Sequence, residues 1–485
     1  MTALSIAKED CTGCSVCQSV CPNSSIDMLP DECGFLYPSI DSSSCVDCNI
    51  CNESCPVLCR DKITRKKYFM RSSYAGYFLN AKKLLESSSG GAATAISEQV
   101  IKRGGVCFGV KYDTYNKPVW GIARTQNELV GFKGSKYAES VRGKFHTLVV
   151  EELTDEKPVL VVGLPCDIAA VRMYIGRINQ NYDNLFLCEL ICSRVTSQKV
   201  LLDFISSKEA SEGKKVITVS LRYKHNGMKI PFFVRYIFED GTETYEPLEK
   251  TDFERGFYYI VRTCCTHCSF KGDNSVADLR LGDYLSLNES HPYYNPGGVS
   301  LIIECSKQGR KLLEYIDNSL FQLHQTDLRG SLQYNKMTQV SFEKHSLSNN
   351  FINEFLENGL NSACRKLLYS QVERLYELLD EKGIDVSMDM IALWGIGNAA
   401  NILYDKFEMS DWNIKYVFDS NKIKEGTFFK GIRITNLSNI PNYAKNIDAV
   451  IITISTVPYE ILSQQLYDIG YLGKSIYLGG GGYII

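Results

Sequence analysis

The residues best suited to chemistry are eight cysteines close to the start of the chain. They form two runs of the pattern C-x2-C-x2-C-x3-C-P, at residues 11–22 and 45–56. Three thiolates spaced in this way can bind three corners of one cubic [4Fe-4S] cluster from a single loop. The fourth cysteine of each run is carried away by the helix that follows, and it can complete the other cluster.

This spacing is that of two-cluster ferredoxins, in which the ligand sets are crossed. The first cysteine group, expected to hold one [4Fe-4S] cluster, comprises Cys11, Cys14, Cys17 and Cys55. The second cysteine group, expected to hold the other, comprises Cys21, Cys45, Cys48 and Cys51. A disulfide framework and zinc are the alternatives. Two matched runs that end in Cys-Pro, in a chain without a recognisable export signal, favour iron-sulfur clusters over both.

Length and composition describe an ordinary globular protein. Its 44% hydrophobic and 22% charged residues are typical of such chains, and a net charge of −3 gives no indication of nucleic-acid binding. The start, MTALSIAKEDC, has no apolar signal core, and no run is long enough to span a bilayer. We therefore expect a cytoplasmic protein without a membrane span. A homo-oligomer is compatible with the sequence.

The 485 residues are too many for one hydrophobic core and predict a multidomain α/β protein. The expected segments are a ferredoxin-like dicluster module at 1–60, a central α/β domain at 61–345, a helical connector at 346–387 and a Rossmann-like α/β domain at 388–485. The dicluster module is too small to form a hydrophobic core of its own, so its folding is expected to depend on its metals. Strands that alternate with helices in the second predict a mostly parallel sheet.

Two segments of the central domain could bind a cofactor with phosphate and a ring. A Ser/Gly-rich turn opens a helix and contains Ser88, Ser89, Gly90, Gly91 and Thr94. Amides at such a turn suit a phosphate or pyrophosphate, although similar turns also cap helices without a ligand. The second segment contains Gly134, Ser135, Lys136 and Tyr137. Its cation and stackable ring are typical of flavin or nucleotide sites, and a surface loop is the alternative.

A third cysteine group is dispersed through the central domain and comprises Cys166, Cys192, Cys265 and Cys268. Cys265 and Cys268 form a C-x2-C pair, which needs two further ligands to hold a tetrahedral metal or a cube. On spacing alone, a third cluster, a zinc ion and unliganded buried thiols all remain open.

The last hundred residues contain a glycine motif in a strand-turn-helix context. Gly395 and Gly397 follow the strand IALW in a G-x-G-x-x-A pattern, and Asp419 ends the next strand. An acid about twenty residues after the glycines accepts a ribose hydroxyl in dinucleotide folds. The alternative is that the glycines only allow close packing of the helix.

Motifs of the central domain occur in one order: Ser89-Gly90-Gly91, GSKY at 134–137, GLPCDIAAVR at 163–172, LICSRVTS around Cys192, C-x2-C at 265–268, ADLRLGDY at 277–284 and GGVSLIIE from 297. In this order they resemble the coenzyme F420 hydrogenase/dehydrogenase beta-subunit family, over residues 1 to about 345. The chain departs from the family at LICSRVTS, where relatives commonly read CHG. Cys264 beside Cys265 also leaves two candidates for one ligand.

The resemblance implies an FAD-containing iron-sulfur flavoprotein. In such proteins the flavin lies among the Ser/Gly turn and the GSKY segment, next to a further [4Fe-4S] cluster that the third cysteine group would hold. Clusters pass single electrons whereas organic reductions need pairs, and a flavin converts one into the other. No catalytic acid can be chosen among the scattered histidines.

We therefore expect a flavin-dependent reductase that takes electrons from a ferredoxin-type donor and reduces a small-molecule substrate. The carboxy-terminal domain looks like Rossmann-like units attached to enzymes of surface-polysaccharide and nucleotide-sugar metabolism. That likeness favours a sugar nucleotide or glycan precursor as substrate, and a nucleotide or nucleotide-sugar as ligand of this domain. The alternatives are an oxidoreductase of the deazaflavin coenzyme F420 and a non-catalytic electron-transfer subunit of a larger complex.

Overall fold

A computed structural model describes residues 4–63, 70–153, 156–178, 182–225, 227–228, 232–285, 287, 289–454, 457 and 459–478. The chain divides into two compact units, Met1–Asn361 and Ser362–Ile485, and each is described by itself. Both units combine helices with sheets that contain parallel strands, so the predicted multidomain α/β fold class is confirmed. Within the described ranges, every helix is too short or too polar to cross a lipid bilayer.

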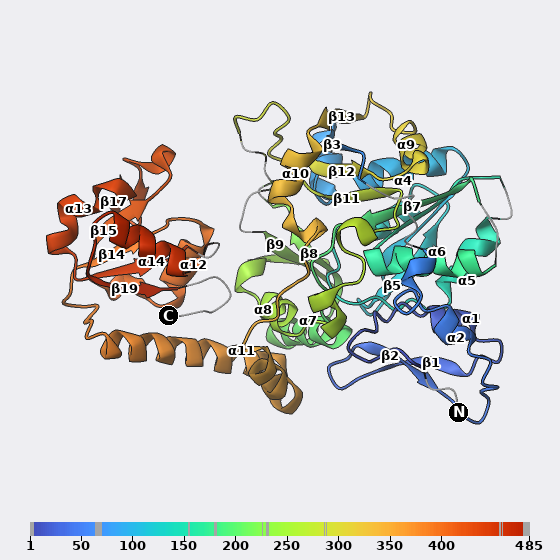
Figure 1. Ribbon diagram of the computed structural model, residues 1–485, viewed down its shortest axis with the longest axis horizontal. Coiled ribbons are helices and arrows are strands. Elements are labelled where there is room, and N and C mark those ends of the chain that lie inside the picture. The colour runs from blue at the N-terminus through green and yellow to red at the C-terminus, as the bar shows by residue number, and fades with distance from the viewer. Residues whose placement is uncertain are drawn as a thin grey trace. The chain divides into compact units, whose positions relative to one another are not determined.

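An eight-stranded sheet forms the centre of the first unit (Figure 1). Its strands lie in the order β13-β3-β12-β11-β7-β6-β4-β5. The bounds are β3 (Ser72–Phe78), β4 (Val106–Tyr112), β5 (Pro118–Ala123), β6 (Val159–Gly163), β7 (Leu185–Leu190), β11 (Leu279–Asp283), β12 (Ser300–Glu304) and β13 (Phe321–Thr326). Neighbours among β11, β7, β6 and β4 are parallel, whereas the pairs toward both edges are antiparallel.

The expectation of a mostly parallel sheet is therefore wrong outside these four strands. A short turn at 113–117 joins β4 to β5, and such a turn can close an antiparallel pair but not a parallel one. In this turn Asp113 Oδ1 accepts hydrogen bonds from the amides of Tyr115 and Lys117. The turn thus fixes the direction in which β5 returns.

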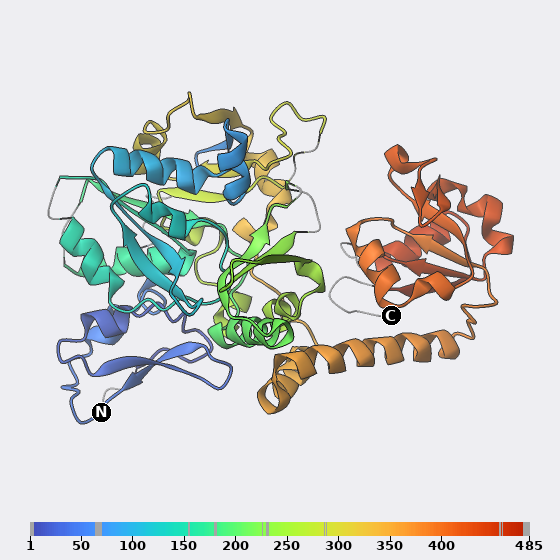
Figure 2. The same ribbon diagram turned by 180° about the vertical axis from the view of Figure 1, so that it is seen from behind.

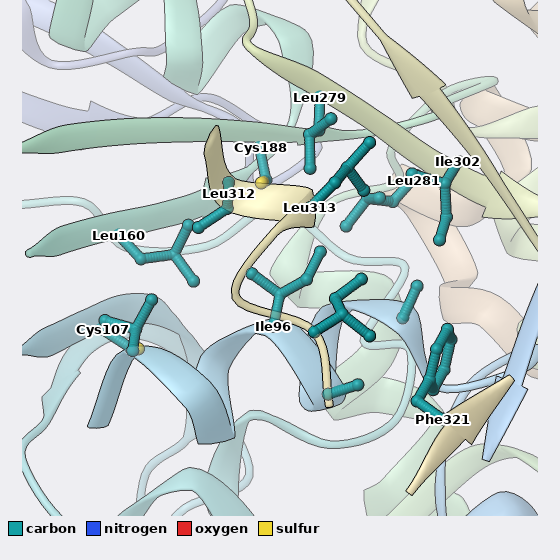
Figure 3. Close-up of a cluster of buried hydrophobic side chains, with 14 of the residues drawn as sticks. Ile96, Cys107, Leu160, Cys188, Leu279, Leu281, Ile302, Leu312, Leu313 and Phe321 are labelled. Carbon is teal, nitrogen blue, oxygen red and sulfur yellow. The ribbon is translucent and has the colours of Figure 1, made fainter. Parts of the chain in front are cut away.

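Alternate residues of a strand are buried in two different cores, one on each face of the sheet. The helices that pack on or beside the sheet are α3 (Ala81–Glu86), α4 (Ala92–Lys102), α5 (Phe145–Glu152), α6 (Pro165–Arg177), α9 (Lys307–Leu313) and α10 (Leu328–Tyr334). Leu160 lies in the core beneath α4 and α9, together with Ile96 and Leu312 (Figure 3). Val159 and Val161, on either side of Leu160, lie in the opposite core beneath α5 and α6. This alternation is the period of a strand.

The cysteine module at the start of the chain has almost no core of its own. Its elements are α1 (Val16–Val20), β1 (Ile26–Pro30), β2 (Leu36–Ile40) and α2 (Ile50–Glu53), with β1 and β2 antiparallel. The buried residues Cys14 and Val16 pack on Ala170 of α6. The module therefore shares its small core with the central domain.

A second, antiparallel sheet completes the first unit, in the order β10-β9-β8. Its strands are β8 (Val216–Tyr223), β9 (Phe233–Phe238) and β10 (Glu243–Pro247), and the helices beside it are α7 (Gln198–Glu212) and α8 (Asp252–Tyr259). Both helices begin at a capping side chain: Ser197 accepts from the amide of Val200, and Thr251 accepts from that of Glu254.

The second unit contains a six-stranded sheet in the order β16-β17-β15-β14-β18-β19 (Figure 2). Its elements are β14 (Ile391–Trp394), α12 (Asn398–Lys406), β15 (Ile414–Asp419), β16 (Phe428–Phe429), β17 (Ile432–Asn436), α13 (Ile440–Tyr443), β18 (Ala449–Ile452), α14 (Tyr459–Asp468) and β19 (Lys474–Tyr477). Except for β16, neighbouring strands are parallel, in the doubly wound order 3-2-1-4-5. Before this sheet, α11 (Ser348–Glu381) is interrupted at Gly359, where φ is 84°.

We predict that Gly90→Ala destabilises the first unit by about 1–3 kcal/mol. A Cβ at this position would lie 2.0 Å from Gly76 O and 2.5 Å from the amide nitrogen of Ser300, so the strands beside the turn would have to move. Thermal unfolding followed by circular dichroism measures the effect. Gly176→Ala in α6 is the matched control, because its Cβ would meet nothing within 4 Å. Equal melting temperatures for the two variants would contradict the prediction.

Candidate functional site

The first two cysteine groups border two separate hollows. One is lined by residues that include Cys11, Cys14, Cys17 and Cys55. The other is lined by residues that include Cys21, Cys45, Cys48 and Cys51. Each hollow is thus bordered by three cysteines of one run and the last cysteine of the other. Whether these thiols bind clusters stays a prediction.

The two loops share the same backbone conformation around their second cysteine. In each run the residues on both sides of the second cysteine are left-handed: Gly13 and Ser15 have φ of 67° and 63°, and Asp47 and Asn49 have φ of 51° and 60°. A residue with a side chain costs about 1–3 kcal/mol in this conformation and keeps it only where its surroundings impose it. The repeated strain therefore indicates a common ligand-binding loop.

The electrostatics of the first hollow also fit a metal centre. Burial, followed by the neighbouring Cys55 thiol, raises the pKa of Cys14 to about 12. Iron binds thiolates, so this donor set suits a group that brings positive charge. In the described ranges no three Cys, His, Asp or Glu side chains could hold one metal ion together. A cube differs from such a site because each thiolate binds a different iron.

The third cysteine group comes together from distant parts of the chain. Cys166 lies in the first turn of α6, Cys192 follows β7, and Cys265 and Cys268 belong to one short loop. Burial, then Asp167, and further the thiols of Cys192 and Cys268 raise the pKa of Cys166. Burial raises the pKa of Cys192, and the thiols of Cys265 and Cys268 raise it further. The four side chains are therefore within electrostatic range of one another.

Lys271 holds the loops of this group in place. Its Nζ donates to the carbonyl oxygens of Cys192 and Met337, the latter at 2.6 Å. Cys264, the alternative to Cys265, is buried, and the neighbouring Cys265 thiol raises its pKa. After burial, the Cys265 thiol also raises the pKa of Cys192 and Cys268, which indicates that it lies near both.

Sequence reasoning missed a set of buried charges between the first and third cysteine groups. We call it the buried charge chain, and it consists of Arg262, Glu139, Arg142 and Asp167. None of the four side chains is more than 2% exposed. A signal was present, because each charge stands within or beside a motif: GSKY, GLPCD or the Cys264-Cys265 pair.

The Ser/Gly turn is tied to the sheet by its own hydrogen bonds. The amides of Gly90 and Ala92 donate to Ser300 Oγ at 2.9 and 3.3 Å, and Ser89 Oγ donates to Val299 O at 2.8 Å. Gly91 is left-handed, with φ of 88°, as the start of α4 requires. The amides predicted to face a phosphate are thus partly engaged within the protein. At the same helix start, Ser88 is exposed and Thr94 is half-buried.

The GSKY segment is also organised from within. Lys136 is buried, and its Nζ donates at 2.8–3.2 Å to the carbonyl oxygens of Gly131, Phe132, Lys133 and Gly134. Burial lowers the pKa of Lys136 to about 7. Ser135 and Tyr137 are half-buried, and Tyr137 lies 5.1 Å from the ring of Phe257. Lys136 therefore orders its own loop, while Gly134 and its neighbours reach the surface.

Two cations at the end of β8 connect these segments, and sequence reasoning missed both. Arg222 pairs with Asp283 at 2.7 Å. Burial lowers the pKa of Arg222, but Tyr137 and Asp283 raise it by more, so its net pKa lies above the usual value. The Nζ of Lys224 donates to Gly297 O at 2.7 Å and also to Ser89 O. Residues two apart at a strand end share a face, so Arg222 and Lys224 stand between the Ser/Gly turn and GSKY.

In the second unit, Gly395 follows β14 at the point where the strand order reverses. Its φ is 97°, and a Cβ would lie 2.1 Å from Ile454 Cγ1, so close packing alone requires glycine here. A Cβ on Gly397, at the start of α12, would meet nothing within 4 Å.

Asp419, the predicted ribose acceptor, already has partners. Its Oδ2 accepts from the amide of Ile396 and from Lys424 Nζ, both at 2.8 Å. Its Oδ1 accepts from the amide of Asn421, also at 2.8 Å. The carboxylate therefore ties the glycine turn to the end of β15.

Comparison with protein families finds two matches in different parts of the chain. Residues 156–328 match the family described as the carboxy terminus of the beta subunit of Coenzyme F420 hydrogenase/dehydrogenase. Residues 387–464 match the family described as CoA binding domain. The predicted resemblance to the beta-subunit family and the Rossmann-like character of the tail are thus confirmed. No curated protein matches the chain.

Solved structures add weaker similarities. A chain of the F420-reducing [NiFe] hydrogenase complex from Methanosarcina barkeri is 16% identical, with 66% of this chain and 97% of that chain covered and a TM-score of 0.38. RSP, a Rex-family repressor, is 18% identical over 24% of this chain and 78% of its own, with a TM-score of 0.16. Neither TM-score is high enough to carry an argument about activity.

We predict that Cys55→Ala and Cys21→Ala disturb different clusters, because each removes the cysteine that crosses to the other hollow. Cys55→Ala should remove the spectroscopic signal that Cys11→Ala also removes, and Cys21→Ala the signal that Cys45→Ala removes. Iron and sulfide analysis with electron paramagnetic resonance of anaerobically prepared protein measures this. Cys33→Ala, outside both runs, is the control and should change neither. Loss of the same signal in Cys55→Ala and Cys45→Ala would show that the groups are not crossed.

Proposed function

We propose, from the match of residues 156–328 to the coenzyme F420 hydrogenase/dehydrogenase beta-subunit family, that this chain is an iron-sulfur flavoprotein oxidoreductase. It accepts electrons from a ferredoxin-type donor and reduces a small organic substrate. The observation that carries the proposal is the pair of hollows bordered by the crossed cysteine groups. The third cysteine group stands close to the first, because Arg262 bonds to Cys11 and to Cys265.

The three cysteine groups would supply the ligands of three [4Fe-4S] clusters. Such clusters carry single electrons, and FAD converts these into the electron pair that an organic reduction needs. The first hollow is lined by apolar side chains, among them Leu4, Ile6 and Met28, which keep water from the thiols. Cys48 of the second group is exposed, which fits contact with a donor protein.

The flavin would lie between the Ser/Gly turn and the GSKY segment, beside Arg222. Ser88 and Gly134 expose polar atoms there, and Tyr137 offers a ring for stacking. Arg222 keeps its positive charge, which suits the diphosphate of FAD. Lys136 orders the loop through the carbonyl oxygens that it binds.

The substrate class that we propose is a sugar nucleotide or glycan precursor of surface-polysaccharide metabolism. Its support is the Rossmann-like second unit, an addition that electron transfer alone would not need. Residues 387–464 of this unit match a nucleotide-type fold, the CoA binding domain.

The function is tested on the anaerobically purified full chain. We expect iron and sulfide for three clusters and one FAD per chain, and we expect reduced ferredoxin to bleach the flavin band. Reduced F420 and NAD(P)H are offered separately to the same preparation. Faster bleaching by reduced F420 than by ferredoxin would replace the proposal by a deazaflavin oxidoreductase. Iron without any flavin would leave an electron-transfer subunit, and colourless protein with zinc or cystines would overturn the proposal.

A second candidate function concerns the tail, and the match to the CoA binding domain favours it. We propose that the second unit binds a nucleotide or nucleotide-sugar near Gly397, where a Cβ would meet open space. Asp419 accepts two hydrogen bonds at Oδ2 and one at Oδ1, which leaves Oδ1 able to accept one more. A ribose hydroxyl would therefore donate to Oδ1, beside the amide of Asn421.

We predict that a nucleotide ligand raises the melting temperature of the second unit. A ligand at one hundred times its Kd raises the free energy of unfolding by about 2.7 kcal/mol. Coenzyme A, NAD⁺ and UDP-, GDP- and CMP-sugars are compared by differential scanning fluorimetry. Asp419→Asn is the matched variant and should weaken a ligand that uses its ribose at this acid. No shift with any of these nucleotides would reduce the unit to a scaffold.

A further inference from the structure

Arg262 is a buried arginine that contacts both the first and the third cysteine groups. Its backbone oxygen accepts from the amide of Cys265 at 2.9 Å. Its side chain reaches the cysteine module, where Nε donates to Cys11 O at 2.8 Å and Nη2 lies 3.9 Å from Cys11 Sγ. The guanidinium also lies over the ring of Tyr37, 4.2 Å from its centre. One residue thus links a cysteine of each group.

Glu139 balances this arginine at the same interface. Its Oε1 accepts from Arg262 Nη1 at 2.7 Å, and its Oε2 accepts from the amide of Leu36 at 2.9 Å. The side chains of Arg262 and Glu139 are 1% and 0% exposed. Water therefore screens this pair little, and its charges act strongly on neighbouring groups.

The buried charge chain continues to the third cysteine group. Arg142 donates to Glu139 Oε1 at 3.3 Å and to Asp167 Oδ1 at 2.5 Å. Asp167 follows Cys166 directly and accepts from the amide of Leu164 at 3.0 Å. Four alternating charges therefore extend from Cys11 to Cys166, in the space between the two groups.

The first loop is shaped to admit this pair, whereas the second loop is not. A Cβ on Gly13 would lie 2.5 Å from Glu139 Oε1 and 2.9 Å from Arg262 Cζ. Its counterpart in the second run is Asp47, which has a similar left-handed backbone and carries a side chain. The two runs are otherwise matched, so the glycine marks the loop that receives the buried pair.

We propose that Arg262 is a positioning residue for electron transfer between the centres held by the first and third cysteine groups. It fixes their spacing by binding both loops, and its charge raises the reduction potential of the centre beside Cys11. This rests on the proposed iron-sulfur function. In the transfer one centre loses one electron and the other gains it, with no bond formed or broken. Reduction adds negative charge, so a nearby cation favours the reduced form and a nearby carboxylate disfavours it.

The test measures midpoint potentials of the anaerobic full chain by potentiometry with electron paramagnetic resonance. Arg262→Gln should make the potential of the centre bound by Cys11 more negative. Glu139→Gln should move it in the opposite direction. We expect shifts of about tenfold in the one-electron equilibrium, which is about 59 mV. Arg262→Lys keeps the charge and should stay near the unchanged protein.

Arg172→Gln is the matched control. Arg172 pairs with Asp278 at 2.9 Å in the same domain, and its loss should leave the potential unchanged. Shifts in the same direction in Arg262→Gln and Glu139→Gln would show mere loosening of the interface and overturn the proposal. Unshifted potentials in both would also overturn it. If Arg262→Gln does not fold, Glu139→Gln and Arg262→Lys decide between the same outcomes. A chain without iron would instead refute the proposed function.

Discussion

A buried arginine is stable only where carboxylate and carbonyl oxygens replace its hydration shell. Arg262 obtains these oxygens from both sides of one interface: Glu139 belongs to the central domain, and Cys11 and Leu36 belong to the cysteine module. The bond to Cys11 spans 251 positions of sequence. Undocking the module would leave an arginine and a glutamate without their partners, which makes the docked arrangement specific.

The cysteine module depends on this interface because its own core is so small. Val16 of α1 packs on Ala170 of α6, only a few residues after Cys166. Ser19 also bonds to His146 Nδ1 at 2.9 Å. Burial, followed by Arg142, lowers the pKa of His146 to about 3, so this contact does not titrate near neutral pH. Apolar packing, a neutral hydrogen bond and a buried ion pair therefore hold the first cysteine group against the helix that begins beside the third.

The sequence was most informative where function depends on local spacing. Each cysteine run shapes one loop, so the pattern alone predicts which thiols share a hollow. Arg262 stands two residues before Cys264, but spacing alone does not give its role, because its partners Cys11 and Glu139 are distant in sequence and show no common period. The same limit applies to the Ser/Gly turn. Its position at a helix start was predicted correctly, but two of the amides expected to be free donate to Ser300 from β12. The edge formed by β5 was misjudged because a five-residue turn decided the direction of that strand.

The second unit shows the difference between a fold and a binding site. Strand order and the position of Gly395 follow from the glycine motif and the hydrophobic strands, and both agree with a doubly wound sheet. Ile454 fills the space beside Gly395, and Lys424 pairs with Asp419 at 2.8 Å. Close packing and a ribose site would both require glycine at this position. Residue types alone therefore do not distinguish the two explanations. The partners of Asp419 are more informative, because its Oδ2 already holds the glycine turn and Lys424, and only Oδ1 can accept one more hydrogen bond from a ligand.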